Sequence, residues 1–354
     1  MKPIAIVGAT GAVGQTLLEM MEQSDTQFEQ IKLFASKSSA GKVVPFRDQK
    51  IAIEEINLNS LLECSTAIFA TDSSISEKYI PLLAEKGILC VDKSSAFRMN
   101  VKVPLVVPEV NGELLTTQEF RTYPVVASPN CCTIPLVMVL KALDDKWKVK
   151  KTIVSTYQSV SGAGKPGVDI LTEESKQFFL THDLTNQKST LFPKSIAFNV
   201  MPFVSSILEN GDTDEESKIM METKKILNNQ NLAMAATSVR VPTFVGHGES
   251  VTIQLEKNFD IEEAITALSK FPGIRVVDEK IFSKNLYSDI DDEDANLIEN
   301  FVTPREAHGR DEVFVSRLRK CEVFENGLSL WIVSDNLRKG AALNAWQIVQ
   351  KYYN

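Results

Sequence analysis

The segment KPIAIVGATGAVGQTLLEMM, residues 2–21, decides the fold of the first half of the chain. Residues 2–7 are almost continuously apolar, which is typical of a strand buried on both faces. Glycines follow at positions 8, 11 and 14, and residues 15–21 are apolar at helical spacing. A strand, a glycine turn and a helix form a dinucleotide-binding arrangement, because glycines permit a tight turn and the helix start favours pyrophosphate. An ordinary glycine-rich turn is the alternative.

The following segments alternate between strand and helix patterns, which predicts a parallel, doubly wound sheet. We expect a helix at residues 76–86 and strands at 31–35, 67–71, 88–92, 103–107 and 123–127. The ligand crevice of such a sheet lies beyond the carboxyl ends of its strands. Four polar residues follow strand ends here: Thr10, Ser38, Ser73 and Arg98.

The second expected strand runs into SKSSAGK, residues 36–42, which carries serines and lysines but no acid. A carboxylate near this strand end would suit the ribose hydroxyl of NAD, whereas hydroxyls and a cation suit the extra phosphate of NADP. The segment therefore favours NADP. A solvated polar loop is an equally good interpretation of these residues alone.

The composition of the whole chain limits the class of protein. At 354 residues it suggests two domains, and its formal charge of −8 argues against a general nucleic-acid surface. No apolar run approaches the roughly 18 residues that span a membrane, and residues 1–11 lack a signal-peptide layout. The five cysteines lack metal-ligand spacing, so we expect reduced thiols, a cytoplasmic location and no metal site.

The second half of the chain has a different pattern. From residue 149 onward, segments such as 152–158 and 250–255 alternate apolar and polar residues, which predicts an antiparallel sheet with one covered face. We also expect a strand at 330–334, helices at 215–227 and 336–353, and an acidic solvated loop at 289–294. The last helix is expected to pack back on the first domain. Glu215 and Lys218 share a helical face, where a surface salt bridge is the commoner outcome.

The segment SPNCCTI, residues 128–134, places Cys131 where a strand gives way to a helix. Unpaired N–H groups in the first turn of a helix favour a thiolate, which is the nucleophile of covalent catalysis. A buried structural cysteine is the alternative. His247, at the end of RVPTFVGH, is the one of three histidines that we expect to partner the thiol, although a lone histidine is more often structural. Gln158 projects near a strand end.

Eleven stretches keep a characteristic order and spacing along nearly the whole chain. They are GATGAVG (8–14), SSAGK (38–42), DKSSAFRM (92–99), VVPEVN (106–111), PNCCT (129–133), TYQSVSGAG (156–164), IAFNV (196–200), EESK (215–218), RVPTFVGHGES (240–250), DEVFVSRLR (311–319) and DNLRKGAALNAWQI (335–348). Through them the sequence resembles the aspartate-semialdehyde dehydrogenase family.

The resemblance implies an α/β protein with two domains. The first is a Rossmann-type NADP-binding domain at residues 1–130, completed by residues 335–354. The second, at 131–334, is an α+β catalytic and dimerisation domain like the carboxyl-terminal domain of glyceraldehyde-3-phosphate dehydrogenase. The implied activity is the NADP-dependent, reversible reductive dephosphorylation of 4-aspartyl phosphate to aspartate 4-semialdehyde, in lysine (diaminopimelate), methionine and threonine biosynthesis. A cytoplasmic homodimer or homotetramer is also implied.

The resemblance also implies roles for individual residues. Cys131 would be the nucleophile, His247 the general base and Gln158 the group that orients the acyl intermediate. Arg240 would hold the substrate carboxylate with a bidentate fork and Glu215 the amino group. Arg98, Asn130 and Lys218 would surround phosphate. The implied cofactor-binding residues are Gly8, Thr10, Gly11, Ala12, Val13, Gly14, Lys37, Ser38, Ser39, Ser161, Gly162 and Asn336.

Several positions depart from the family pattern. Ser38 replaces a common Arg, Thr71-Asp72-Ser73-Ser74 replaces Gly-Gly, Lys93 replaces a common Asn, and residues 201–204 are less polar. The nearest rival is N-acetyl-gamma-glutamyl-phosphate reductase, whose cysteine normally follows Gly rather than Asn130. A non-catalytic NADP-binding paralogue is the rival from another class, and it predicts loss of Cys131, His247 or Arg240, which are all present.

Overall fold

The computed structural model describes residues 3–24, 26, 30–182, 185, 189, 191–277 and 301–353. Two compact units emerge: residues 1–131 with 340–354, and residues 132–339. The carboxyl-terminal segment thus joins the first unit at Gly340, five residues after the expected position. The acidic run at 289–294 lies outside the described residues. Among the helices described, none combines the length and the apolar character that crossing a membrane requires.

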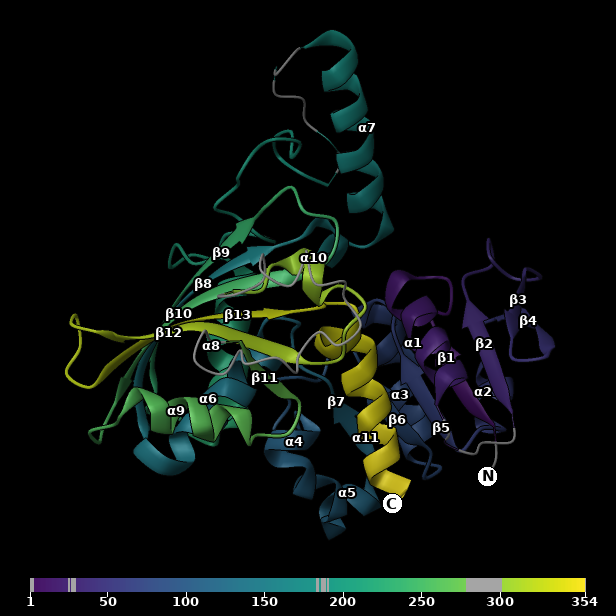
Figure 1. Ribbon diagram of the computed structural model, residues 1–354. Helices are drawn as coiled ribbons and strands as arrows, with labels where there is room; N and C mark the ends of the chain where they lie inside the picture. The colour runs from purple at the N-terminus through teal and green to yellow at the C-terminus, as the bar shows by residue number, and fades with distance from the viewer. Residues whose placement is uncertain are drawn as a thin grey trace. The chain divides into compact units, whose positions relative to one another are not determined.

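The first unit is built on a seven-stranded sheet in the order β3-β4-β2-β1-β5-β6-β7 (Figure 1). Its strands are β1 (Ile4–Val7), β2 (Ile31–Ala35), β3 (Val43–Phe46), β4 (Gln49–Glu55), β5 (Thr66–Phe69), β6 (Leu89–Asp92) and β7 (Val125–Ala127). All pairings are parallel except the β3–β4 pair. The prediction of a parallel, doubly wound sheet is therefore confirmed.

Helices alternate with the strands of this sheet along the chain, as the pattern predicts. They are α1 (Ala12–Gln23), α2 (Leu58–Leu62), α3 (Ser73–Ala84), α4 (Pro108–Asn111), α5 (Gln118–Thr122) and α11 (Leu343–Tyr353), with a short 3₁₀ turn at Gly112–Thr116. Trp346, Ile348 and Val349 of α11 are buried in one cluster with Ile4 and Leu17. The last helix of the chain thus completes the core of the first unit.

The prediction of a strand at residues 103–107 is wrong. Leu105 forms only an isolated bridge with Ala127, and α4 begins at Pro108. Pro104 has no N–H to donate to a ladder, and Pro108 favours the first turn of a helix. The prolines, rather than the apolar run, decide the local structure.

The second unit contains a six-stranded sheet in the order β11-β12-β13-β10-β8-β9. Its strands are β8 (Val149–Gln158), β9 (Ala233–Arg240), β10 (His247–Leu255), β11 (Ile274–Val277), β12 (Val313–Cys321) and β13 (Gly327–Ser334). The expected antiparallel sheet is in fact mixed, because β8–β9 and β11–β12 pair in parallel. Long helices lie between β8 and β9, and the described part of the connection between β11 and β12 contains a short helix. Parallel strands need such long connections, which a two-residue hairpin cannot supply.

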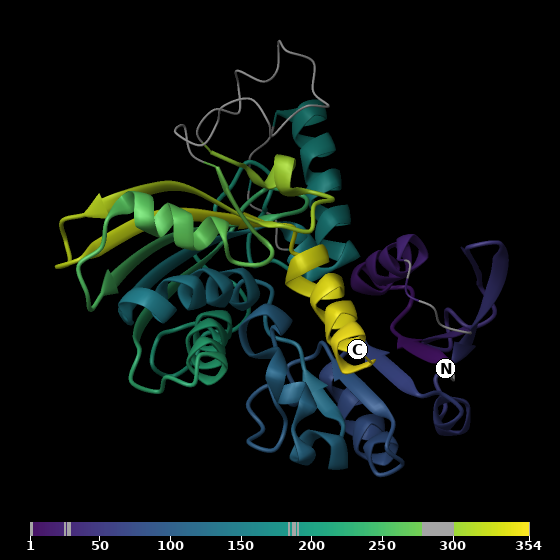
Figure 2. The same cartoon turned by 60° about the horizontal axis from the view of Figure 1, so that its bottom comes forward.

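Helices cover one face of this sheet, as expected, and in the described part of the chain the other face has exposed apolar side chains. Helices α6 (Thr133–Trp147), α8 (Asp214–Ile226) and α9 (Ile261–Ser269) lie against the covered face (Figure 2). Along β8, Val154 is fully buried on that face, whereas Ile153 and Tyr157 are exposed on the other. The unit also contains α7 (Lys165–Thr181) and α10 (Pro304–Ala307).

The expected helix at 336–353 begins later than its apolar pattern suggests. Residues Arg338–Ala342 form a π-helical turn, and regular α11 starts at Leu343. The buried Asp335 carboxylate accepts hydrogen bonds from the N–H groups of Leu337 and Arg338, at 2.8 and 3.2 Å. Local hydrogen bonding of this kind competes with the start of a regular helix.

Candidate active site

The glycine turn after β1 has the geometry of a dinucleotide cradle. Gly8 has a φ of 90°, and a Cβ there would lie 2.1 Å from the Ala70 carbonyl oxygen. A Cβ on Gly14 would lie 2.3 Å from the Gly8 carbonyl oxygen. Gly11 is the N-cap of α1, which has twelve residues. The absent side chains of Gly8 and Gly14 let the turn and α1 pack closely, and Gly11 puts no side chain at the helix amino terminus, so these residues fit the pyrophosphate of a dinucleotide.

The turn after β2 lies where the adenosine ribose of such a ligand is expected. Lys37 and Ser38 are exposed, Ser39 is half-buried, and the Ser36 and Ser38 hydroxyls lie 2.9 Å apart. Hydroxyl groups and a lysine are therefore available at this turn. Asp72, the N-cap of α3, is also exposed and makes no side-chain capping bond.

The segment leading to Cys131 is fixed by Lys93. Its ammonium group donates to the carbonyl oxygens of Pro129, at 3.1 Å, and Gly340, at 3.2 Å, and to the Ser128 hydroxyl at 3.3 Å. The Lys93 carbonyl in turn accepts from Arg98 Nη2 at 2.8 Å, and both Arg98 and Asn130 are buried. A Cβ on Gly340 would lie 3.1 Å from Cys131 Cβ. Lys93 thus joins the cysteine segment to the π-helical turn.

Cys131 itself is half-buried, and the following Cys132 is the N-cap of α6. The strand-to-helix placement predicted for the thiol is therefore confirmed. Cys132 Sγ lies within 4.8 Å of a ring nitrogen of His247. All five cysteines are free thiols.

His247, the first residue of β10, is 1% exposed. Its Nδ1 lies 3.1 Å from the main-chain nitrogen of Ser159, which donates to it, and 3.2 Å from Ser159 Oγ. Within the described part of the chain, His247 Nε2 has no hydrogen-bond partner. One ring nitrogen is anchored and the other is available for a reacting group.

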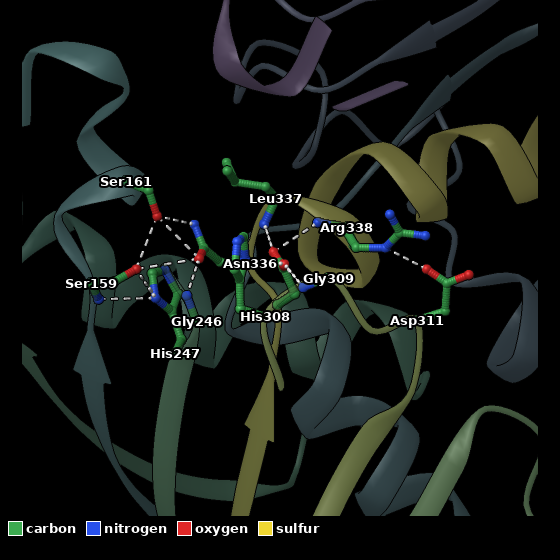
Figure 3. Close-up of polar contacts among 11 residues, drawn as sticks. Ser159, Ser161, Gly246, His247, His308, Gly309, Asp311, Asn336, Leu337 and Arg338 are labelled. Carbon is green, nitrogen blue, oxygen red and sulfur yellow. Dashed lines mark hydrogen bonds and ion pairs between the residues drawn. The ribbon is translucent and has the colours of Figure 1, made fainter. Parts of the chain in front are cut away.

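Asn336 organises the surroundings of this histidine (Figure 3). Its Oδ1 accepts from the Gly246 N–H at 2.8 Å and from the hydroxyls of Ser159 and Ser161, each at 3.2 Å. Its Nδ2 donates to Ser161 Oγ at 3.0 Å. The resemblance predicts that Ser161 and Asn336 bind the cofactor, and in the structure both belong to the hydrogen-bond network beside His247.

A second group of hydrogen-bonded polar side chains begins at the end of β8. Gln158 Nε2 donates to Glu215 Oε1 at 3.1 Å and to Thr156 Oγ1 at 3.2 Å, and Gln158 and Glu215 are buried. Arg240, the last residue of β9, donates from Nη1 to the Ser159 carbonyl oxygen at 2.7 Å. Strands β8 and β9 pair in parallel with Gln158 opposite Arg240, so their carboxyl ends present both side chains together.

Gly162 lies beside both of these groups. A Cβ there would lie 3.0 Å from Arg240 Nη1 and 3.3 Å from His247 Nε2. The guanidinium and the ring nitrogen therefore both lie close to this glycine. A ligand carboxylate held by Arg240 would place its neighbouring carbons near His247.

Lys218 lies one turn along α8 from the buried start of the helix. It is half-buried and pairs with Asp214, four residues earlier. Glu215 instead accepts the bond from Gln158. The structure thus brings Gln158, Glu215, Arg240 and His247 together within the second unit and places Lys218 on the same helix as Glu215.

Two residues that sequence reasoning missed have central positions. Ser159 contacts both His247 and Arg240, and Lys93 was noted only as a departure from the family pattern. Ser159 directly follows Gln158 at a strand end, which was the available signal. Its importance depends on main-chain groups, whose partners a sequence does not reveal.

The chain is similar to known proteins over its full length. Residues 3–118 match the family model "Semialdehyde dehydrogenase, NAD binding domain", and residues 140–339 match "Semialdehyde dehydrogenase, dimerisation domain". Aspartate-semialdehyde dehydrogenase of Aquifex aeolicus is 41% identical, with 98% of this chain and 96% of that protein covered. The Rickettsia bellii enzyme of the same name is 39% identical over the same shares.

A solved structure of aspartate semialdehyde dehydrogenase II from Vibrio cholerae, complexed with ASA, has the same fold. Its TM-score is 0.90 at 34% identity, with 100% of this chain and 98% of that chain covered. The first unit of the present chain is therefore a nicotinamide dinucleotide-binding domain, and the second is of the dimerisation type.

Proposed function

The chain belongs to the aspartate-semialdehyde dehydrogenase family, and from this premise we propose that it interconverts 4-aspartyl phosphate and aspartate 4-semialdehyde with NADP. The observation that carries the proposal is the arrangement of Arg240 and His247 Nε2 around Gly162. A carboxylate-binding guanidinium beside an available acid–base nitrogen suits a substrate with a carboxylate and a reacting carbonyl. The reaction belongs to the biosynthesis of lysine, methionine and threonine.

In the direction of acyl phosphate formation, the Cys131 thiolate attacks the aldehyde carbon, the aldehyde oxygen takes up a proton, and a thiohemiacetal forms. His247 Nε2 takes the proton of its hydroxyl group while the carbonyl of a thioester forms. Arg240 holds the substrate carboxylate, Glu215 its amino group, and Gln158 orients the acyl group. Inorganic phosphate, bound by Arg98, Asn130 and Lys218, then attacks the thioester carbon, and the thiolate leaves.

A bound nicotinamide dinucleotide would accept the hydride that the thiohemiacetal carbon loses as the thioester forms, and would supply it in the reverse direction. Gly8, Thr10, Gly11, Ala12, Val13 and Gly14 would hold its pyrophosphate. Lys37, Ser38 and Ser39 would hold the ribose phosphate of NADP, for which the exposed hydroxyls and cation at this turn are the support. Ser161, Gly162 and Asn336 would complete the site near the nicotinamide.

We further propose a cytoplasmic homodimer formed through the open face of the six-stranded sheet. Exposed Ile153, Tyr157 and Phe301 lie on or beside this face. A hollow of about 370 Å³ is lined by Ser250, Phe301, Arg317, Arg319, Leu330 and Trp331. Ile153→Glu should convert the dimer to a monomer in light scattering after gel filtration. An unchanged mass would remove this face as the interface.

The proposed cytoplasmic location is supported by the cysteines, which are free thiols as expected in a reducing compartment.

The test of the function is a phosphate-dependent assay of NADP reduction with aspartate semialdehyde. N-acetylglutamate semialdehyde and NAD serve as parallel controls. We expect strong activity with the aspartyl aldehyde and NADP. Preference for the acetylated aldehyde would establish the rival reductase, and folded, NADP-binding protein without activity on either aldehyde would establish the non-catalytic paralogue.

A further inference from the structure

His247 must hold a particular proton if it is to act as the base, and this requirement rests on the proposed function. A ring nitrogen accepts a proton only through its lone pair. For Nε2 to take the substrate proton, the neutral ring must already carry its proton on Nδ1. That Nδ1–H then needs an acceptor, as in other sites where a third group fixes the tautomer of a catalytic histidine.

The surroundings of Nδ1 offer two opposed partners from one residue. The main-chain N–H of Ser159 lies 3.1 Å away and favours an unprotonated Nδ1, because it is a donor only. Ser159 Oγ lies 3.2 Å away and has lone pairs that accept from a protonated Nδ1. The hydroxyl is therefore the group that permits the tautomer required of a base.

Asn336 determines which way that hydroxyl points. Its Oδ1 lies 3.2 Å from Ser159 Oγ and accepts the hydrogen bond of that hydroxyl, while Ser161 Oγ, at 3.0 Å, can donate to Ser159 Oγ. A second lone pair of Ser159 Oγ then remains for His247. The same oxygen accepts from the Gly246 N–H, so the residue before His247 is held as well. Asn336 is 2% exposed and Ser159 is fully buried, so water does not compete at these atoms.

The preceding residue, Asp335, keeps Asn336 in place. The carboxylate of Asp335, which is 1% exposed, accepts from the Gly309 N–H at 2.8 Å and contacts His308 Nδ1 at 3.1 Å, as well as holding Leu337. Arg338 Nε donates to Asp311 at 2.7 Å (Figure 3). The main chain on both sides of Asn336 is thus anchored independently of the histidine.

We propose that the Ser159 hydroxyl, oriented by Asn336, accepts a hydrogen bond from the Nδ1–H of His247 whenever Nε2 gains or returns the catalytic proton. When Nε2 takes the proton of the thiohemiacetal, the ring becomes an imidazolium whose Nδ1–H donates to Ser159 Oγ. In the reverse direction Nε2 returns that proton to oxygen, and Nδ1 keeps its own. Ser159 and Asn336 are positioning residues in this scheme.

Other groups that face the ring act differently. Cys132 Sγ lies within 4.8 Å of a ring nitrogen, and Arg240 Nη1 lies close to Gly162, as Nε2 does. Glu249, two residues along β10, is buried on the same side of the strand. The hydrogen bonds found at Nδ1 in the described chain come from Ser159, so a change at this residue acts on that nitrogen first.

The direct test is nitrogen NMR of protein labelled in histidine, which has only three such residues. His182→Gln and His308→Gln variants assign the remaining signal to His247. In the wild type at a pH where the ring is neutral, we expect a measurable Nδ1–H population. Ser159→Ala keeps the main-chain N–H and loses the acceptor, so only the Nε2–H tautomer should remain.

The kinetic arm uses the same variant. Ser159→Ala should lower kcat about 10²-fold with little change in KM, because general base catalysis is typically worth at least that factor. Ser159→Thr retains a hydroxyl and should restore both kcat and the Nδ1–H signal. Asn336→Ala should reduce the Nδ1–H population without removing it, which keeps the proposal testable if Ser159→Ala fails to fold.

Ser334→Ala is the matched control. Ser334 is a buried serine opposite His247 on the neighbouring strand, and its hydroxyl has no hydrogen-bond partner in the described structure. It should leave the tautomer and kcat unchanged. An unchanged Nδ1–H population in Ser159→Ala, or its absence from an active wild type, would overturn the proposal. If Ser159→Ala loses the Nδ1–H population as expected but the wild-type protein has no dehydrogenase activity, the proposed function alone is contradicted.

Discussion

At the scale of single residues, Arg240 shows how one side chain can serve the fold and the site together. One guanidinium N–H is committed to the Ser159 carbonyl at 2.7 Å, and the group faces Gly162. The bond to Ser159 orients the planar fork before a ligand arrives. Preorganisation of this kind lowers the entropy lost when a substrate carboxylate binds.

Arg240→Lys should therefore weaken substrate binding, seen as a higher KM, much more than it lowers kcat. A lysine keeps the charge but cannot bond Ser159 and grip a carboxylate with a planar fork at once. We expect KM for aspartate semialdehyde to rise about 10- to 100-fold, from the loss of one charge-assisted bond. Steady-state kinetics measure this change, with Arg319→Lys on the open sheet face as control. An unaltered KM would place Arg240 outside the site.

At the scale of elements, the β1 turn and α1 depend on glycines for contact distance rather than for flexibility. Gly14 lies inside α1, and a Cβ there would meet the Gly8 carbonyl oxygen at 2.3 Å and Ala9 Cα at 2.9 Å. Both opposing atoms are main chain, so no side-chain movement relieves the clash. The helix can approach the strand end this closely only with glycine at that position.

Gly14→Ala should push α1 away from the turn and weaken dinucleotide binding. We expect Kd for NADP, measured by calorimetry, to rise at least about 10-fold, together with a loss of stability of about 1–3 kcal/mol from overpacking. Gly41→Ala is an informative comparison, because that glycine has positive φ but open space around it. Equal NADP affinity in Gly14→Ala and the wild type would contradict this account of the turn.

The sequence predicted the elements whose pattern was strongly periodic. It failed where local chemistry overrides the pattern, as with Pro104 and Pro108 in the expected strand and Asp335 ahead of α11. Helix α7 was not predicted, because its buried residues are only Gly167 and Leu171 and its apolar stripe is weak. The strand order of the mixed sheet depends on long-range pairing, which periodicity does not encode.

The candidate site was predictable to a similar degree. Side chains with recognisable chemistry, such as Cys131, His247 and Arg240, lie in sequence motifs. The order and spacing of these motifs along the chain identify the family, so these side chains could be predicted. Ser159 and Lys93 act largely through main-chain atoms of distant residues, including Pro129 and Gly340. Such partners become visible only when the chain is folded.

At the scale of the whole molecule, buried thiols connect stability to pH. Burial raises the pKa of the Cys64 thiol from 9.0 to about 11, and burial also raises the pKa of Cys90. Between pH 9 and 11 the unfolded chain loses these protons while the folded chain keeps them. The folded state then binds more protons, so the free energy of unfolding falls as pH rises through this range.

Cys64→Ala should make that decline less steep. We expect the stability of the wild type to fall by on the order of 1–3 kcal/mol more than that of the variant between pH 9 and 11. Urea unfolding at several pH values measures the difference. Cys321→Ala is the matched control, because hydrogen bonding to the Val323 main chain lowers the pKa of that thiol. Parallel curves for wild type and Cys64→Ala would refute the assignment.

The central claim is that Cys131 carries the acyl group as a thioester. The most direct measurement is to mix the enzyme with aspartate semialdehyde and NADP without phosphate, quench in acid and map the modified peptide by mass spectrometry. We predict one aspartyl group on Cys131, released when phosphate is added before the quench, and none in Cys131→Ser. An aspartyl group on Cys132, or NADP reduction by Cys131→Ser at the wild-type rate, would contradict the account.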